Sequence, residues 1–511
     1  MKMAWIISVF LSLVARIPSL NLISYQWRPL QTEMTAYWFS NEGIDIFNYQ
    51  TPIYGPPWQI PFEFPLFQAT GALIARSGLV NVEFACKLVA LISFYLSALF
   101  LYLVCNQIFI DKKVTFVIIA LYLLLPYNIY YSTEPLIDYL ALALAFAYLF
   151  FILQWLRTRP SVWNAFMATI FGSLGVLVKP TTTPVVIVPI LIFVIIDITQ
   201  IYKINFTRPV NRKSLLNHIW DERGYWLTLV LMAVIPVLIG DLWTRHSDKI
   251  KSSSIFTQWL TSKALQNWNF GTWGLRANWD IWINYGSAAE RFFLPFGLIV
   301  FALLGILTAT GIIKTPEEKT ETKIFIITIF ASVLLVLIIF LNLYRHQYYY
   351  IALSASMAIL AGYGIVWLWE HRQKTRSIFT LILAIWAILF IIGNFEDYET
   401  LRNMTISDSQ KMEQLTTWGR KVQQYIAPDQ WAVVVEYDWD PTYVYPLERK
   451  TMVVTPREID KPLCTLLADK RFTLVVVGDL AYENNQEFLK YTFRCFSSED
   501  EVMPGVYKVT H

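Results

Sequence analysis

Four carboxylates occupy positions where the sequence can hold them in a cavity rather than in open solvent. Glu33 follows the first apolar segment, and Glu63 lies between phenylalanines and prolines in PFEFP (61–65). Asp138 falls just inside a later apolar run, and Glu134 lies at the mouth of that run. Carboxylates in such surroundings are costly unless they are paired or solvated. Beside a hydroxyl group, one of them could act as a general base. The alternatives are simple solvation for Glu33 and a favourable first-turn position for Glu134.

Cations also lie near the ends of apolar runs. Lys179 lies in GVLVKPTTTP, a polar break between two runs, and Arg345 and His346 lie in NLYRHQYYY. An Arg-His pair followed by three tyrosines offers an anion site beside stacking surfaces, which suits a phosphate or a sugar. The alternative is that these long side chains only extend to lipid headgroups. We group Arg28 of the first loop with these three residues as candidate phosphate-binding side chains.

A third set of side chains could line a substrate groove, where aromatic rings stack on a sugar or hold an isoprenoid chain. This set consists of Gln31, Trp58, Tyr131, Glu134, Tyr348 and Tyr349. Most aromatic residues of a membrane protein only form interfacial belts or pack. The stretch from Trp58 to Gln68 is expected to enter the headgroup boundary.

The cysteines do not have the spacing of a metal site. Cys86 and Cys105 lie in one apolar run, and Cys464 and Cys495 lie near the C-terminus. We therefore predict no metal site, and the sequence requires no cofactor, although a divalent metal is compatible with the chemistry. Cys464 and Cys495 could form a disulfide in an oxidising compartment or stay as two thiols.

The composition places these residues in a membrane protein. Of 511 residues, 56% are hydrophobic and 15% are charged, whereas soluble domains carry about 25% charged residues. A soluble enzyme, a disordered scaffold and a nucleic-acid binder are excluded, and the net charge of +3 is too small for a bulk electrostatic partner. Runs long enough to cross a bilayer predict an all-α polytopic protein with about eleven transmembrane helices, at 3–23, 84–107, 114–130, 135–156, 162–178, 183–200, 226–243, 292–313, 324–343, 348–369 and 377–394.

The loops and the tail predict the orientation and a second domain. Basic residues concentrate in the loops that share a side with the N-terminus, which predicts a cytoplasmic N-terminus. Long outer loops then cover 24–83 and 244–291, and a membrane domain (1–395) precedes a small extracytoplasmic α/β domain (396–511). In that domain we expect helices at 408–426 and 457–469 and strands at 431–438, 450–455 and 471–479.

The order of these parts resembles the polytopic class C (GT-C) glycosyltransferases of the family-39 type, which include protein O-mannosyltransferases and lipid A aminoarabinose transferases. The resemblance covers the Arg-Ile-Pro exit from the first span, the acidic first loop, EFPL, PYNIYYSTEPLID, GVLVKPT and RHQYY. The tail segment YDWDPTYVYPLERK is similar to the small outer domain appended to many such bacterial enzymes.

The resemblance implies an inverting transfer of one sugar from a polyprenyl-phosphate carrier to an acceptor hydroxyl at the outer face of a membrane. The acceptor would be a glycolipid, a cell-envelope glycan such as lipopolysaccharide, or a protein, and no nucleic acid is involved. Short loops and the tail favour a bacterial plasma membrane. The main alternatives are a lipid-linked sugar flippase or transporter and a non-catalytic assembly subunit. Ionisable residues at helix ends and the lack of a repeat favour an enzyme over a transporter.

The sequence departs from the family pattern at two positions. Relatives carry an acidic base shortly after the first span, where this chain has Gln31, with Glu33 two residues later. Either the register shifts and Glu33 is the base, which we favour, or Glu63 is the base. If Glu33 is the base, we expect Glu63 to orient the acceptor or the neighbouring backbone. Relatives also show Glu-Lys-Pro where this chain has Glu-Phe-Pro. Lys179 and Arg345 therefore become stronger phosphate-binding candidates, and Asp138 is expected to orient the acceptor or a cation.

Overall fold

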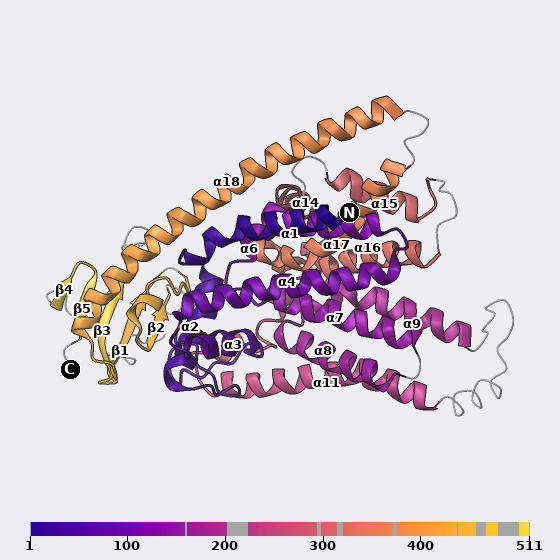
Figure 1. Ribbon diagram of the computed structural model, residues 1–511. Coiled ribbons are helices and arrows are strands. Elements are labelled where there is room, and N and C mark those ends of the chain that lie inside the picture. The colour runs from indigo at the N-terminus through magenta and orange to yellow at the C-terminus, as the bar shows by residue number, and fades with distance from the viewer. Residues whose placement is uncertain are drawn as a thin grey trace.

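The computed structural model describes residues 2–158, 161–201, 223–293, 298–313, 320–370, 376–436, 438–455, 467–478 and 500–509. Long helices lie side by side in a bundle, and a small sheet lies at one end of it (Figure 1). The bundle contains α1 (Lys2–Arg16), α4 (Val82–Ile108), α5 (Lys112–Leu124), α7 (Asp138–Arg157), α8 (Val162–Val178), α9 (Ile187–Ile201), α11 (Arg223–Lys251), α15 (Leu298–Ala309), α16 (Thr320–Phe340) and α17 (Ile351–Glu370).

Seven helices of the described chain are long and apolar enough to cross a membrane. They are Met3–Asn21, Val82–Ile108, Asp138–Arg157, Thr183–Gln200, Arg223–Lys251, Thr320–Arg345 and Gln347–Glu370. Leu66–Ala75, Val162–Val178 and Leu298–Ala309 are shorter apolar helices. The predicted segment 114–130 is two helices, because the residue before Pro126 is biased away from the α conformation and α5 ends there. The polar Asn81 and Asp111 side chains cap α4 and α5 by accepting hydrogen bonds from backbone amides.

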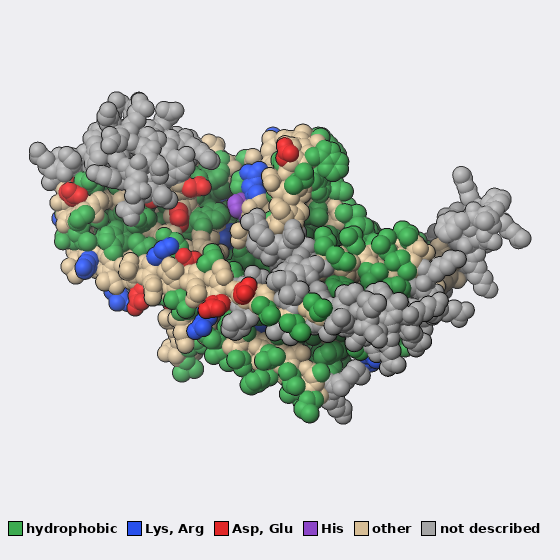
Figure 2. Space-filling model, turned by 90° about the horizontal axis from the view of Figure 1, so that it is seen from above, with side chains coloured by type: hydrophobic (Ala, Val, Ile, Leu, Met, Phe, Trp, Pro, Cys, Tyr) green, Lys and Arg blue, Asp and Glu red, His purple; other side chains and the backbone are tan. Residues whose placement is uncertain are grey.

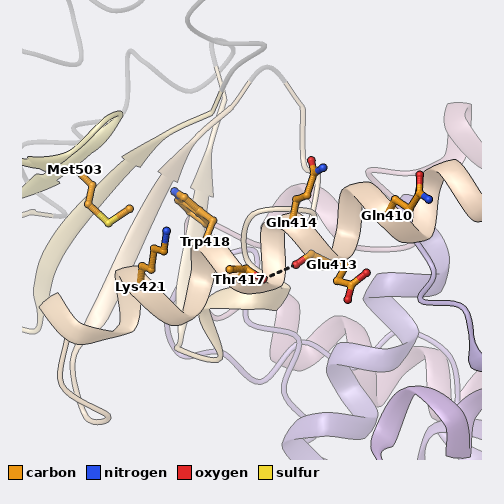
Figure 3. A pocket seen from close by; sticks show the side chains of 7 residues that line it. All are labelled: Gln410, Glu413, Gln414, Thr417, Trp418, Lys421 and Met503. Carbon is orange, nitrogen blue, oxygen red and sulfur yellow. Dashed lines mark hydrogen bonds between the residues drawn. The ribbon is translucent and has the colours of Figure 1, made fainter.

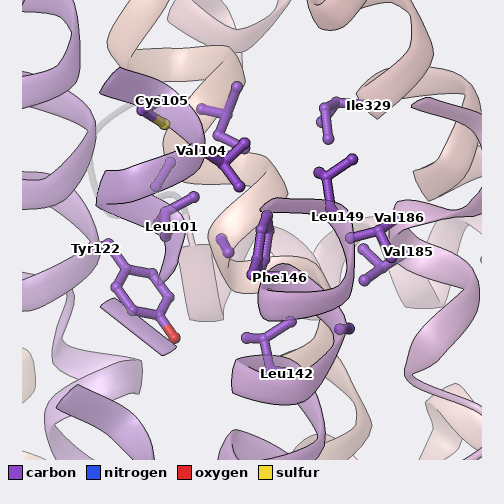
Figure 4. Packing of buried hydrophobic residues seen from close by; sticks show 14 of the residues in the cluster. Leu101, Val104, Cys105, Tyr122, Leu142, Phe146, Leu149, Val185, Val186 and Ile329 are labelled. Atoms are coloured by element: carbon purple, nitrogen blue, oxygen red, sulfur yellow. The ribbon is translucent and has the colours of Figure 1, made fainter. Parts of the chain in front are cut away.

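A continuous hydrophobic core holds the bundle together. Leu101 and Val104 of α4 and Phe146 and Leu149 of α7 pack with Ile329 of α16 (Figure 4). The backbones of α15 and α17 approach each other so closely that only glycine fits at two positions of the crossing. A Cβ atom on Gly364 would lie 2.0 Å from the Phe301 carbonyl oxygen, and one on Gly305 would lie 2.4 Å from the Leu360 carbonyl oxygen. Small residues permit this close backbone approach between membrane helices.

The first long loop contains two helices that the sequence analysis did not predict, α2 (Trp27–Glu42) and α3 (Leu66–Ala75). The turn between them contains Trp58, which is 4% exposed. Its ring contacts Trp431 and Phe472 of the C-terminal sheet at ring-centroid distances of 5.0 and 6.4 Å. Trp58 therefore packs in a protein core instead of facing headgroups, because the sheet covers this turn.

The second long loop contains η3 (Gln258–Leu260), α12 (Gln266–Phe270), α13 (Trp273–Ala277) and α14 (Trp279–Phe293). The short linkers of the bundle contain α6 (Pro126–Tyr131), η2 (Thr183–Val186), η4 (Leu341–Arg345) and η5 (Gln347–Tyr350). These linkers include the polar segments 126–138, 179–186 and 341–350, which therefore lie at the ends of the long helices.

The C-terminal part of the chain forms a five-stranded mixed sheet in the order β2-β1-β3-β5-β4. Its strands are β1 (Trp431–Val435), β2 (Thr451–Val454), β3 (Phe472–Val477), β4 (Glu501–Met503) and β5 (Val506–Lys508). β1 pairs in parallel with β2 and β3, whereas β5 is antiparallel to β3 and β4. The three predicted strands are present in the structure, and most of 457–469, Cys464 and Cys495 lie outside the described residues.

The helix α18 (Arg376–Val422) joins the bundle to the sheet (Figure 1). It unites the predicted span 377–394 and the predicted helix 408–426 in one continuous element. Near its end it packs on η8 (Tyr445–Leu447), where a Cβ atom on Gly419 would lie 2.4 Å from the Pro446 carbonyl oxygen. The glycine therefore sets how closely the helix approaches the sheet domain.

Candidate functional site

Arg28 and Glu63 form an ion pair between two parts of the first loop. Arg28 lies in the first turn of α2, and its guanidinium binds a Glu63 carboxylate oxygen. The same guanidinium donates a 2.6 Å hydrogen bond to the side-chain oxygen of Gln31, one helical turn further on. The Arg28 and Glu63 side chains are 14% and 24% exposed, respectively. The pair is therefore partly open to a ligand.

Lys179 and Asp138 form a second and more deeply buried pair. Lys179 follows the end of α8 and Asp138 begins α7, and their side chains are joined at 2.5 Å. The Lys179 ammonium lies 4.2 Å from the ring centroid of Tyr349 and 5.1 Å from that of Tyr348. Four predicted site residues, from three separate bundle segments, therefore meet at one place.

The two pairs act on each other electrostatically. Burial acts to raise the pKa of Glu63, but the positive charges of Arg28, Lys179 and Lys251 outweigh it and lower the pKa below its ordinary value. The Glu63 charge, with weaker contributions from Tyr348 and other groups, overcomes burial and raises the pKa of Arg28. Both side chains are therefore charged at neutral pH, and the site has more cationic than anionic groups around Glu63.

Lys251 also lies close enough to influence Glu63 of the candidate site, although it was not predicted from the sequence. It ends α11, is 6% exposed, and its ammonium lies 4.5 Å from the ring centroid of Phe62. A cation at the end of an apolar run is the signal that identified Lys179, and the same signal was available here. It was overlooked because the predicted span ended at 243, whereas the helix continues to Lys251.

Glu33 lies in a separate cluster. Arg28 and Gln31 share a face of α2, and the helical period turns Glu33 to the other side. Glu33 is fully buried, and neither carboxylate oxygen has a hydrogen-bond partner in the described chain. Burial and the charges of Glu83 and Glu134 raise the pKa of Glu33 well above its ordinary range, although the positive Lys87 opposes them. The surroundings therefore favour the neutral acid.

Glu134 belongs to the Glu33 cluster. Its carboxylate lies 3.7 Å from the ammonium of Lys87, which also donates a 3.3 Å hydrogen bond to the Thr133 carbonyl oxygen. Both side chains of this pair are almost completely buried. Glu134 thus helps to hold a loop against α4, and its second carboxylate oxygen has no partner within the described residues.

Arg345 and His346 lie in the segment that carries the tyrosines, and both contact Trp268 of α12. The Arg345 guanidinium binds the Asn342 side-chain oxygen and lies 5.7 Å from the Trp268 ring centroid, so it is directed toward α12. The His346 ring lies 6.0 Å from the Tyr348 ring, and burial together with the Arg345 charge lowers the pKa of His346. The His346 ring also lies 5.5 Å from the Trp268 ring, so both side chains lie beside α12.

Tyr131 closes another side of this region. Its hydroxyl donates a 3.3 Å hydrogen bond to the Gln347 side chain, and the neighbouring Tyr127 hydroxyl donates a 2.6 Å bond to the Gln347 carbonyl oxygen. These bonds fix the segment that carries Tyr348 and Tyr349. Among the predicted groove residues, Trp58 is the one that the structure places in the sheet core instead.

A loop of the C-terminal segment contacts the start of α2, where Arg28 lies. The indole N–H of Trp27 donates to the Trp439 carbonyl oxygen, and the Trp439 ring lies 5.3 Å from Tyr54 and 5.0 Å from Trp259. These aromatic residues were not among the site residues predicted from the sequence. On the face shown in Figure 2, Lys, Arg and His side chains lie in a hollow of a largely hydrophobic surface.

Within the described residues, no group of three or more His, Cys, Asp or Glu side chains is arranged to hold a metal ion. The arrangement offers two carboxylates that are each paired with a cation, a third cation in Lys251, and two tyrosine faces. Such a set can bind a phosphate through charge-assisted hydrogen bonds while a carboxylate accepts a proton.

The fold is similar to that of known membrane glycosyltransferases. The chain matches ArnT from Cupriavidus metallidurans, solved bound to undecaprenyl phosphate, with a TM-score of 0.60 and 12% identity over 93% of both chains. It matches the oligosaccharyltransferase of Archaeoglobus fulgidus in the apo form with a TM-score of 0.51 and 12% identity, over 92% of this chain and 69% of that one.

The archaeal enzyme AglB from the same organism, in complex with an inhibitory peptide and a dolichol-phosphate, matches with a TM-score of 0.50 and 13% identity. That match covers 93% of this chain and 69% of AglB. No protein-family model and no curated protein sequence matches the chain. The chain therefore has the fold of the GT-C polytopic membrane glycosyltransferases, with a C-terminal mixed sheet appended to its helical bundle.

Proposed function

We propose that this protein is an inverting glycosyltransferase that moves a sugar from a polyprenyl-phosphate donor to an acceptor hydroxyl. The observation that carries the proposal is the convergence of the Arg28–Glu63 and Lys179–Asp138 pairs beside two tyrosines. The undecaprenyl phosphate of the ArnT structure and the dolichol-phosphate of the AglB structure support a polyprenyl-phosphate ligand.

The geometry supports Glu63, rather than Glu33, as the general base. Glu63 is charged and partly exposed beside three cations, whereas Glu33 is sealed in a cluster that favours its neutral form. A base must accept a proton from a hydroxyl within hydrogen-bond reach, so an ionised and accessible carboxylate is required. Gln31, at the position where relatives carry an acid, then positions Arg28 through their hydrogen bond.

The reaction is a single displacement. The acceptor hydroxyl gives its proton to Glu63, its oxygen bonds to the anomeric carbon, and the bond from that carbon to the phosphate oxygen breaks. The departing polyprenyl phosphate gains negative charge, which Arg28 and Lys179 stabilise, with Lys251 and His346 nearby. Tyr348 and Tyr349 provide surfaces for the sugar. Attack from the side opposite the phosphate inverts the anomeric centre.

The site residues and the basic loops together support an orientation. We place the N-terminus in the cytoplasm and the C-terminal sheet outside a bacterial plasma membrane, with a glycolipid, cell-envelope glycan or protein as acceptor. Protease added to intact spheroplasts should then remove the C-terminal domain. Protection of the domain in intact cells, with digestion after lysis, would reverse this orientation.

The direct test is sugar transfer by the purified protein in nanodiscs, with a polyprenyl phosphate that carries a radiolabelled sugar. Label should appear in the acceptor with inverted stereochemistry, and free polyprenyl phosphate should be released. Arg28→Gln should weaken donor binding by roughly 10- to 150-fold, as expected for losing a hydrogen bond to a charged group. Arg76→Gln, at an exposed arginine after α3, is the matched control.

The alternatives give different results in the same system. A flippase would move the labelled donor across a vesicle membrane without any acceptor and would release no polyprenyl phosphate. A non-catalytic assembly subunit would transfer nothing with any acceptor. Either result would contradict the transferase proposal.

A further inference from the structure

A cavity of about 510 Å³ lies outside the proposed active site, between the last turns of α18 and β4. Six of its lining residues come from α18 and one from the sheet: Gln410, Glu413, Gln414, Thr417, Trp418, Lys421 and Met503. The helical residues are spaced at three and four positions, so they lie along one face of α18. Figure 3 shows Trp418, Lys421 and Met503 near one end and Gln414 and Gln410 further along the helix.

The residues that line the cavity combine one aromatic ring with several polar side chains. Gln410, Glu413, Gln414 and Lys421 are exposed, and Trp418 is half-buried. Within the described part of the chain, the side chains of Gln410, Gln414 and Lys421 make no hydrogen bond to protein. Each amide offers two donors and one acceptor oxygen, and the ammonium offers three donors. These groups are therefore available to a ligand rich in hydroxyl groups.

The formal charges of the residues that line the cavity cancel. Glu413 and Lys421 carry opposite formal charges, and the other lining residues are neutral. A phosphate or an acidic glycan would need several cations in one place, which this cavity lacks. A neutral sugar has an apolar face of C–H groups surrounded by hydroxyl groups. That pattern matches an indole ring flanked by amide, carboxylate and ammonium groups.

The cavity is linked to the proposed active site through one loop. The Trp418 ring contacts the Tyr443 ring at 5.6 Å. Four residues earlier, the Trp439 carbonyl oxygen accepts the hydrogen bond from Trp27, which precedes Arg28 in α2. The Trp418 ring of the cavity therefore packs on the loop whose Trp439 carbonyl oxygen binds the residue before Arg28.

The geometry points to a binding site for a neutral oligosaccharide in this cavity, with Trp418 as the stacking surface and Gln410, Gln414, Glu413 and Lys421 as hydrogen-bonding groups. We further propose that this cavity binds the glycan part of the acceptor during transfer, and this role rests on the proposed function. Binding of the oligosaccharide itself does not, because it requires neither donor nor transfer.

The test measures binding of oligosaccharides to the full-length protein in nanodiscs, without donor. The probes are a neutral glucose trimer, a neutral N-acetylglucosamine trimer and an acidic galacturonic acid trimer. Binding of each probe is measured by saturation-transfer NMR and calorimetry. At least one neutral trimer should bind, and the acidic trimer should bind at least tenfold more weakly. Trp418→Ala should weaken binding at least tenfold, whereas Trp163→Ala, at an exposed tryptophan of α8, should leave it unchanged.

Trp418→Ala also removes the packing contact with Tyr443, so it could weaken binding by disturbing the fold. A second variant separates these two effects. Gln414→Ala alters an exposed helix position and should weaken neutral-trimer binding by about three- to tenfold without changing thermal stability. The inference is overturned if neither neutral trimer binds, if the acidic trimer binds equally well, or if both variants bind as tightly as the unmodified protein.

Transfer assays separate this inference from the proposed function. With a glycan acceptor, Trp418→Ala should raise the KM for acceptor at least tenfold and leave the KM for donor unchanged. If trimers bind as expected and no transfer occurs, the cavity is a glycan site and the transferase proposal fails. If transfer occurs with an acceptor KM that Trp418→Ala does not change, the cavity is not the acceptor site.

Discussion

Replacing Glu63 with Gln should abolish most of the transfer activity, whereas the same change at Glu33 should not. Glu63 is ionised because the charges of Arg28, Lys179 and Lys251 lower its pKa, so Glu63→Gln removes a functional negative charge. Burial and neighbouring carboxylates raise the pKa of Glu33, so Glu33→Gln exchanges one neutral group for another of similar shape. The two substitutions are chemically identical and differ only in their surroundings.

The magnitudes follow from the proposed role and from the ion pair. A general base contributes about 10²–10⁴-fold to the rate, which corresponds to roughly 3–5 kcal/mol in the activation barrier. Glu63→Gln should therefore lower kcat by at least ~100-fold. The variant also releases the Arg28 guanidinium from its carboxylate, so donor KM should stay the same or fall. Glu33→Gln should change kcat by less than about threefold, or ~0.6 kcal/mol.

The assay follows transfer of a labelled sugar at saturating donor and acceptor, with donor binding measured separately by calorimetry. A loss of kcat with donor still bound identifies an interaction made in the transition state. Glu63→Asp, which keeps the charge but shortens the reach, should recover part of the activity. If Glu63→Gln keeps at least a tenth of the normal kcat while Glu33→Gln loses ~100-fold, the assignment is wrong and Glu33 is the base.

Further predictions concern stability and the second ion pair. Because the folded-state pKa of Glu33 is raised, its contribution to stability is present below the unfolded pKa near 4.3 and is lost as pH rises toward the folded value, at up to about 1.4 kcal/mol per pH unit. The melting temperature of Glu33→Gln should therefore rise relative to that of the unmodified protein between pH 5 and 8, and a constant difference would contradict the burial argument. Gly364→Ala should destabilise the bundle by about 1–3 kcal/mol in thermal unfolding because its Cβ has no space, whereas Gly224→Ala, with no atom near its Cβ, should not. Lys179→Met leaves Asp138 buried without its partner and should cost about 3–5 kcal/mol. Adding Asp138→Asn should restore stability without restoring donor affinity, and recovery of donor affinity would show that Lys179 does not bind the phosphate.

The amino-acid sequence was sufficient for the overall class of the fold. Long apolar runs have few ways to satisfy their backbone in lipid other than as helices. Seven of the eleven predicted spans coincide with helices of the described chain that are long and apolar enough to cross a membrane. The strands at 431–435, 451–454 and 472–477 were also predictable, because short runs rich in valine between polar turns favour strands. The order of motifs indicated the GT-C fold, which the structural similarity to ArnT confirms.

Local patterns were less informative in the first loop. The helix α2 was not predicted, because its sequence has no clear apolar stripe. Without the helix, the sequence could not show that Arg28 and Gln31 face one way and Glu33 the other. The role of Trp58 was misplaced for a related reason, since its partners Trp431 and Phe472 lie hundreds of residues later in the chain.

The sequence by itself determined which residue types are available at the helix ends: carboxylates, cations and tyrosines near polar breaks in apolar runs. Only the tertiary structure decided their partners. Arg28 meets Glu63, and Asp138 meets Lys179, because the rotation of each helix is set by packing against neighbours that are distant in sequence. The charge state of a carboxylate depends on burial and on the charges that surround it. For that reason Glu33 and Glu63, alike in the sequence, differ in the folded protein.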